Sequence, residues 1–366
     1  MSDDKISAAQ FLILILLYMT STASVSNLDI YFAKQDAVFA SLFAIPFGLL
    51  SYYIIVQLQK RYPGRTLYQY SEDILGRWGG KIIGLVYIYL MLEISVLFVR
   101  AFSEFMVSVL SPEMSTDAYA LAIIIISVYA MFKGIEAIGR IAQLIFPFYL
   151  FILLFIGILL IGQFRTENIF PLLDTRIGNV AFASYLQYIL PMGEIVLFSC
   201  VLPFVKDSKN IFSLGALGVV LSGLFLTLRA FISLGVLGRE TAAISNYPFV
   251  SAIRFIRIGE FVERIDILYL GIYVMVGLIE FIIVFNMFVR GVATLFDVKN
   301  EKPLAVPLGL LVAGLAETVL RSTVDLGDYI VKVRTITSPL FMLVIPLLLL
   351  FVSRMRHGKG PVNKVK

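Results

Sequence analysis

The sequence predicts an all-α integral membrane protein in which ten helices cross the bilayer. The 366-residue chain is 59% hydrophobic and only 15% charged, whereas soluble domains hold about 25% charged residues. Apolar runs recur along nearly its whole length, each of a size that suits a helix crossing a hydrocarbon core of about 30 Å. No polar segment between them could form a soluble domain. The expected spans are 8–27, 36–59, 82–107, 118–136, 141–163, 178–204, 211–237, 264–290, 304–320 and 335–353.

The basic residues predict the orientation. If the N-terminus lies inside, the cytoplasmic segments hold most of the Lys and Arg, and residues 60–81 and 354–366 are the richest of them. Lys332 and Arg334 fall in an outer loop in this scheme. The positive-inside rule then places both termini in the cytoplasm, so residues 1–366 form a single transmembrane domain with short cytoplasmic tails at about 1–7 and 354–366. The same bias explains the net charge of +5, which therefore does not indicate nucleic-acid binding.

The sixth span contains a helix breaker and a carboxylate near its middle. Pro191 lacks an N–H group and clashes with the preceding turn, so the helix should break there. Gly193 and Glu194 follow directly. Broken backbone at membrane depth is tolerated where it lines a cavity or is buried in protein, and an ionisable side chain there indicates a functional site. These residues predict a binding site for a small solute, and a packed proline kink is the structural alternative.

The first span carries a matching interruption, formed by Thr20, Ser21, Thr22 and Ser24. Hydroxyl groups at such positions bond to carbonyl groups of the preceding turn and can bend or open a helix, although they also mediate ordinary helix packing. Spans one and six correspond if the chain consists of two five-span halves. Because five is odd, the second half is inverted, as in transporters whose broken helices meet at the midplane.

Other intramembrane charges occur in pairs. Glu93 lies near the centre of the third span and is a candidate cavity-lining or proton-binding group. Arg100 and Glu104, four residues apart near one end of that span, are expected to pair, as are Glu317 and Arg321 in the ninth span.

The composition offers few of the residues on which enzyme active sites commonly depend. The chain has one histidine, His357, and one cysteine, Cys200. Ser–His and Cys–His pairs are therefore not expected, and a cage of His and Cys around a metal is excluded by count. We expect neither a cofactor nor a metal.

Several loop motifs, taken in order, resemble those of one family. They are Arg61-Tyr-Pro-Gly-Arg-Thr66-Leu67, Leu75-Gly76 with Gly80-Lys81, Lys133-Gly134-Ile-Glu136, Asn168-Ile-Phe-Pro171, Gly193-Glu194 before Leu202-Pro203, and Phe261-Val-Glu263-Arg264. This set resembles the bacterial spore germination permeases, the B subunits of GerA-type nutrient receptors in the amino acid–polyamine–organocation superfamily.

The resemblance implies a LeuT-like fold, a 5+5 inverted repeat with broken helices 1 and 6. It also implies nutrient sensing in the spore inner membrane and assembly with an A subunit and a lipoprotein C subunit. The ligand-binding residues would be Thr20, Ser21, Thr22, Ser24, Glu93, Pro191, Gly193 and Glu194, and the ligand an amino acid or similar small nutrient. This chain departs from the pattern in lacking glycines in the first-span break, and in having Glu280 where many members have lysine.

Three functions share this fold. The first is a receptor subunit that binds a nutrient at the two breaks and reports a population shift to its partners. The second is a permease that moves an amino acid with a proton carried on Glu194 or Glu93. The third is a scaffold with a vestigial site. The missing glycines and the resemblance favour the receptor.

Overall fold

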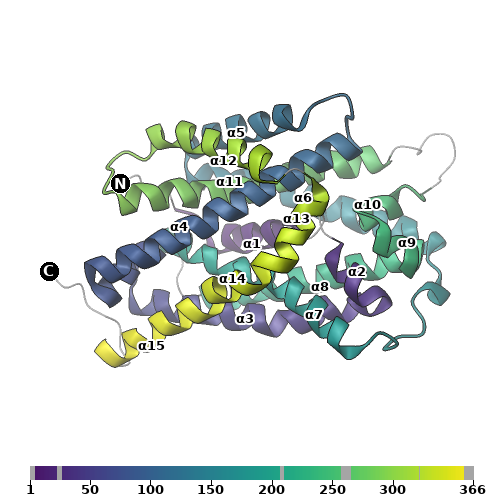
Figure 1. Cartoon of the computed structure of the whole chain (residues 1–366), viewed down its shortest axis with the longest axis horizontal. Coiled ribbons are helices and arrows are strands. Elements are labelled where there is room, and N and C mark those ends of the chain that lie inside the picture. The colour runs from purple at the N-terminus through teal and green to yellow at the C-terminus, as the bar shows by residue number, and fades with distance from the viewer. Residues whose placement is uncertain (1–4, 23–26, 207–209, 257–264, 321, 358–366) are drawn as a thin grey trace.

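The computed structural model describes residues 5–22, 27–206, 210–256, 265–320 and 322–357, and these residues are almost entirely helical (Figure 1). Nine helical segments in the described part of the chain are long and apolar enough to cross a bilayer, and a tenth, α1, is shorter. The prediction of an all-α integral membrane protein is thereby confirmed. The helices are α1 (Ala8–Thr22), α2 (Leu28–Ala33), α3 (Ala37–Arg61), α4 (Leu67–Val109), α5 (Thr116–Lys133), α6 (Ile135–Leu160), α7 (Ile177–Ile189), α8 (Ile211–Leu237), α9 (Arg239–Ile244), α10 (Pro248–Ile253), α11 (Ile265–Leu295), α12 (Ala305–Val319), α13 (Thr323–Tyr329), α14 (Thr335–Pro339) and α15 (Ile345–His357).

Most expected spans agree with the observed helices to within a few residues, and α8 has the expected bounds. Two spans begin well before the expected residue: α4 begins at Leu67 and not at 82, and the last span also begins early. Helix α13, a π-helical turn (Ile330–Arg334), α14, a second π-helical turn (Leu340–Val344) and α15 follow one another directly. The apolar segment therefore runs over Val324–Arg356 instead of beginning at residue 335. Arg334 consequently lies inside the membrane-spanning segment, and its placement in an outer loop was wrong.

The sixth span breaks at the expected place. Helix α7 ends at Ile189, Leu190 takes an extended conformation with φ −155° and ψ 101°, and a 3₁₀ helix continues over Met192–Cys200. The chain beyond Pro191 is therefore wound more tightly than an α-helix and is not an open loop. In the first span, α1 ends at Thr22 and α2 begins at Leu28. Residues 23–26 between them lie outside the described residues.

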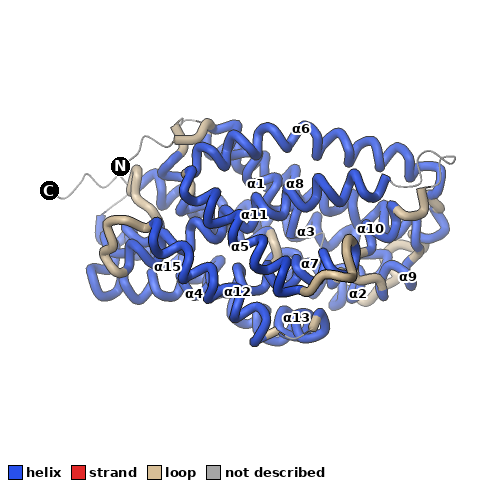
Figure 2. The backbone as a smooth tube through the Cα atoms, turned by 90° about the horizontal axis from the view of Figure 1, so that it is seen from above, coloured by secondary structure: helices blue, strands red, loops and turns tan. Residues whose placement is uncertain are grey.

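Helix α1 lies inside the bundle, where it contacts α6, α8 and α11. Around it, α3 packs on α7 and α8, and α4 packs along α11 (Figure 2). The short helix α2, which follows the first interruption, packs against α7, which precedes the second. These contacts bring the two interrupted spans together in the core.

One end of the bundle gathers several chain segments. Ile6 forms a bridge with Val205, in which Ile6 N–H donates to Phe204 O at 2.9 Å and Lys206 N–H donates to Ile6 O at 2.9 Å. Arg61, at the end of α3, donates to both the hydroxyl and the carbonyl of Ser353. Residues 60–81 lie at this end, which corresponds to the predicted cytoplasmic side. The orientation and the inverted five-plus-five repeat stay predictions.

Helix α4 turns a corner at Gly76. This residue has φ +80°, a conformation that glycine adopts without steric cost. Before the corner lies the first part of α4, whose start is stabilised by the Thr66 N–H donating to Gln69 Oε1 at 3.1 Å. At the corner the two arms approach so closely that a Cβ on Gly80 would lie 2.3 Å from the Cα of Glu72. Glycine at positions 76 and 80 therefore builds the bend.

We expect Gly80→Ala to lower the melting temperature of the purified chain. The added methyl group meets backbone atoms, which cannot rotate away, so the cost should be that of overpacking, about 1–3 kcal/mol. Gly314→Ala in α12 is the matched control, since a Cβ there meets nothing within 4 Å and alanine favours the helix. Equal melting temperatures for the two variants would contradict this account of the bend.

Candidate functional site

Glu194 is the centre of a polar network in the core. The residue is fully buried in the 3₁₀ helix after the break. Its Oε2 accepts a hydrogen bond from Tyr18 Oη of α1 at 2.7 Å, and its Oε1 accepts one from Arg334 Nη2 at 2.8 Å. Charge-assisted bonds of this kind are the strong ones in a low-dielectric interior. Glu194 therefore joins the first, sixth and last spans.

Arg334 is placed by the π-helical turn Ile330–Arg334 and is 1% exposed. Besides Glu194, it faces Glu93 of α4, with Nε 3.7 Å from Oε1. Glu93 Oε1 also accepts a hydrogen bond from Tyr329 Oη at 3.1 Å. Single π-helical turns are frequent at functional sites because they redirect side chains. Here the turn belongs to the helix that directs a guanidinium group into the core between two carboxylates.

The network borders a cavity of about 50 Å³, lined by Glu194, Glu280, Arg334 and apolar residues of α4 and the last span. That volume can hold a few water molecules or one small polar group. Glu93 and Glu194 share one guanidinium, and Glu280, which is also buried, adds a carboxylate to the same cavity wall. Buried carboxylates are costly unless they are paired. The cluster is therefore suited to hold a proton or the cationic end of a small ligand.

The hydroxyl residues of the first-span interruption differ in what surrounds each of them. Thr20 donates to the Leu16 carbonyl of its own helix at 2.7 Å. Ser21 is buried, its carbonyl accepts from Tyr273 Oη at 3.0 Å, and its hydroxyl has no hydrogen-bond partner among the described residues. Thr22 ends α1, but its side chain lies outside what the structure describes, as does the whole of Ser24. Among the described side chains of α1, Tyr18 bonds to Glu194.

Pro191 and Gly193 shape the backbone that carries Glu194. Pro191 stands at the break itself, where it cannot donate a hydrogen bond to the end of α7. A Cβ on Gly193 would lie 2.8 Å from Met342 Sδ and 3.1 Å from Tyr188 Cε2. Glycine thus lets the 3₁₀ helix approach the second π-helical turn of the last span.

A second buried cluster lies beside the two interruptions. Asp29 of α2 accepts from Gln187 Nε2 of α7 at 2.8 Å, and its Oδ2 lies 3.6 Å from Arg229 Nη2 of α8. Asp29 Oδ1 and Gln187 Oε1 have no hydrogen-bond partner in the described part of the chain. This cluster links the segment after the first break to the helix before the second.

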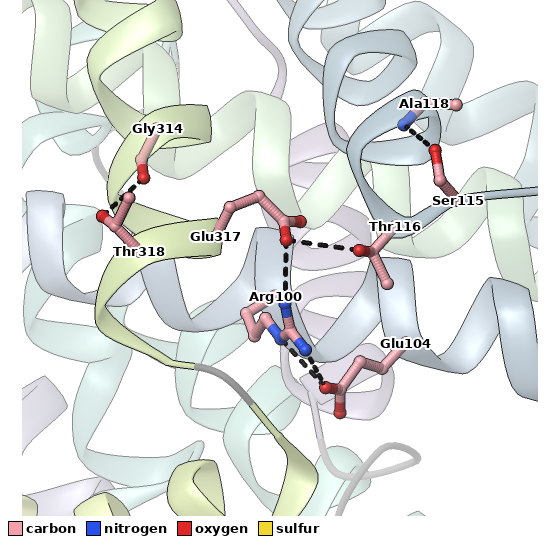
Figure 3. A network of polar contacts seen from close by, with 8 residues as sticks. All are labelled: Arg100, Glu104, Ser115, Thr116, Ala118, Gly314, Glu317 and Thr318. Carbon is pink, nitrogen blue, oxygen red and sulfur yellow. Dashed lines mark hydrogen bonds and ion pairs between the residues drawn. The ribbon is translucent and has the colours of Figure 1, made fainter.

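A third network lies away from these breaks and connects α4, α5 and α12 (Figure 3). Arg100 bonds to Glu104, as expected, and its Nη1 donates to Glu317 Oε2 at 2.9 Å. Thr116 Oγ1 donates to the same oxygen at 3.2 Å. The expected partner of Glu317, Arg321, lies outside the described residues. The structure therefore gives Glu317 a partner on another helix, and this network ties three helices together.

The sequence reasoning missed Tyr18, Arg334 and the cluster around Asp29. Tyr18 is one of many aromatic residues and carries no local signal. Arg334 could have been found by charge balance, because Glu93, Glu194 and Glu280 all fall within apolar runs and a buried carboxylate requires a partner. Asp29 was hidden because it lies just outside the expected first span.

The fold and this network define a class: a multi-pass helical membrane protein with a buried ion network at a broken helix. The family model described as "Spore germination protein" matches residues 5–321, and the chain belongs to this family. Spore germination protein KB of Bacillus subtilis (strain 168) is 27% identical over 369 aligned positions, covering 100% of this chain and 98% of that protein. Spore germination protein YndE of the same organism is 28% identical, covering 84% and 85% of the two chains. Spore germination protein A2 is 24% identical, covering 69% and 70%.

We expect the effects of Arg334→Met and Glu194→Gln on stability to be coupled. Arg334→Met leaves two buried carboxylates without their guanidinium and should lower the melting temperature strongly. Adding Glu194→Gln removes one of those charges, so the double variant should melt at a higher temperature than Arg334→Met alone. The coupling free energy should be about 0.5–3 kcal/mol.

Glu317→Gln provides the control for this experiment. It removes a carboxylate that contacts Arg100 and not Arg334, so its effect should add to that of Arg334→Met. If the effects of Glu194→Gln and Arg334→Met on the melting temperature also prove additive, Glu194 and Arg334 do not interact as their contact indicates.

Proposed function

We propose that the chain is the membrane subunit of a spore nutrient germinant receptor, which binds a small polar nutrient between the interrupted first and sixth spans. The nutrient class is an amino acid or a similar metabolite. The observation that supports this proposal best is the position of Glu194, whose carboxylate connects Tyr18 of α1, Arg334 of the last span and the backbone after the break.

The proposed mechanism is competition for Glu194. The cavity of about 50 Å³ lies where the sixth span meets α4, α11 and the last span, and among the described residues its lining includes none of the first span, whose Tyr18 contacts Glu194. An ammonium group entering this cavity would meet Glu194 and Glu280 on its wall, and it could replace the guanidinium of Arg334 as partner of Glu194. The last span would then lose one of its contacts to the sixth span. A ligand shifts an equilibrium by its differential affinity for the two states, and here the difference is the contact between Arg334 and Glu194.

The partners and the location belong to the same proposal. The receptor would contain an A subunit and a lipoprotein C subunit in the spore inner membrane, with both termini of this chain in the cytoplasm. Family membership and the helical, apolar fold support a membrane role in germination. A binding site that uses Thr20, Ser21, Thr22, Ser24, Glu93, Pro191, Gly193 and Glu194 is proposed with it. Tyr18 and Arg334 are added from the geometry.

The second candidate is a proton-coupled amino acid permease. It is favoured by one observation, the sharing of a single guanidinium by Glu93 and Glu194 beside Glu280. Protonation of one carboxylate would relieve the excess of buried negative charge and could drive alternating access.

Purified chain in vesicles of phosphatidylethanolamine and phosphatidylglycerol separates the two candidates. A panel of radiolabelled amino acids should include at least one that binds saturably to the wild-type chain and less tightly to Glu194→Gln. The bound ligand should not accumulate in the vesicle lumen under an imposed proton gradient. Sustained, gradient-dependent uptake would show that the chain is a permease. If none of the amino acids binds, the third function, a scaffold with a vestigial site, is favoured.

Spores carrying Glu194→Gln should need roughly ten to a hundred times more germinant for the same response. The substitution preserves volume and removes a charge-assisted bond of about 1.5–3 kcal/mol. Spores carrying Glu317→Gln, in the separate Arg100 network, are the matched control and should respond as wild type does. Abundance of the subunit in the spore membrane must be equal in all strains. A wild-type dose response from Glu194→Gln at equal abundance would remove Glu194 from the site.

A further inference from the structure

A groove of about 490 Å³ lies between α6 and α8, away from the Glu194 network, and its lining also includes Phe164 and, from α10, Phe249. The two helices lie on one flank of the bundle (Figure 2). Every residue of its lining is apolar or glycine except Arg229, whose guanidinium is engaged by Asp29.

The groove opens toward the bilayer. Its rim is formed by Leu154 and Ile158 of α6 and Leu228 of α8, which are 50–64% exposed. Both helices are long and apolar enough to cross a membrane. The surface that such side chains expose at membrane depth is covered by hydrocarbon, so a molecule can enter the groove sideways from the lipid phase.

The dimensions decide which apolar molecule fits. The lining extends from Leu150 to Ile161, which is about 16 Å along a helix axis. Dividing the volume of 490 Å³ by that length gives a cross-section of roughly 30 Å². A helix with its side chains is about 10–12 Å across, so a partner's transmembrane helix would not lie within the groove and could contact only its rim. The length of about 16 Å matches one leaflet, half of a hydrocarbon core of about 30 Å.

We propose that the groove between α6 and α8 binds one acyl chain of a membrane phospholipid. The bound chain would lie against Phe225 and Phe231 of α8 and reach Phe249, the residue by which α10 contacts the groove. Phe249 packs edge-on against Tyr269 of α11 at 5.5 Å. The lipid would thereby support helix α10 from the membrane side.

Gly157 offers a direct way to fill the groove. It belongs to the lining, and a Cβ there meets nothing within 4 Å, so a side chain can start from this position into the groove, and Gly157→Trp is chosen to fill it. Gly314→Trp is the matched control. Its Cβ also meets nothing within 4 Å, and it lies on α12, away from the groove.

The experiment uses the full chain in vesicles of phosphatidylethanolamine and phosphatidylglycerol, with a trace of phosphatidylglycerol that carries a diazirine in the middle of one acyl chain. After irradiation, the labelled residues are mapped by mass spectrometry. Labelling in the wild type should concentrate on the groove walls of α6 and α8 relative to the exposed face of α12. Gly157→Trp should reduce groove labelling roughly tenfold, the effect of losing contacts worth about two methylenes, and Gly314→Trp should leave it unchanged.

Three results would overturn the proposal. The first is labelling of the groove at the level of the remaining lipid-facing surface, with no effect of Gly157→Trp. The second is labelling by a diazirine fatty acid but not by the phospholipid, which would identify a free amphiphile as the occupant. The third is loss of groove labelling when the chain is purified with its membrane partners, which would identify a protein interface. Melting temperatures of the two Trp variants establish that both fold, and Gly157→Leu replaces Gly157→Trp if the larger side chain prevents folding.

Discussion

The contact between Arg334 and Glu194 is the interaction on which the arrangement of the core depends. A guanidinium group inside an apolar helical bundle is tolerated only if carboxylates and hydrogen-bond acceptors surround it. Arg334 meets this condition through Glu194 on the 3₁₀ helix and Glu93 on α4. The last span cannot rotate or slide without removing a charge from its partners. The position of this span relative to the sixth and third spans is therefore set by electrostatics as much as by packing.

The break at Pro191 and the π-helical turn at Ile330–Arg334 both place a charged side chain where Glu194 and Arg334 meet. A continuous α-helix would direct its side chains at regular intervals of about 100° per residue, and both spans depart from that regularity at the point where they meet. The 3₁₀ helix turns Glu194 inward, and the widened π turn lies where Arg334 meets it. Gly193 completes the fit, since a larger residue there would collide with Met342.

The class of protein could be predicted from the sequence because hydrophobicity and span length are local properties. The break at Pro191 was also predictable, since a missing N–H group acts on its own helix. The partners of Glu194 were not, because Tyr18 and Arg334 are 176 and 140 residues away in the chain. The placement of Arg334 in an outer loop was wrong for a physical reason. An arginine beside an apolar run resembles an interfacial anchor, and only burial distinguishes a core arginine from such an anchor. A role of the hydroxyl cluster in binding stays a prediction, and within it Thr20 bonds to the Leu16 carbonyl of its own helix.

The short pairing of Ile6 with Phe204 and Lys206 has a mechanical consequence. Two backbone hydrogen bonds connect the segment that leads into α1 with the segment that leaves the sixth span. Beyond the two interruptions, α2 and α7 are joined by Asp29 and Gln187, and between these contacts Tyr18 bonds to Glu194. The two broken spans are thus joined at three places along their length, so neither can move relative to the other without breaking one of these contacts.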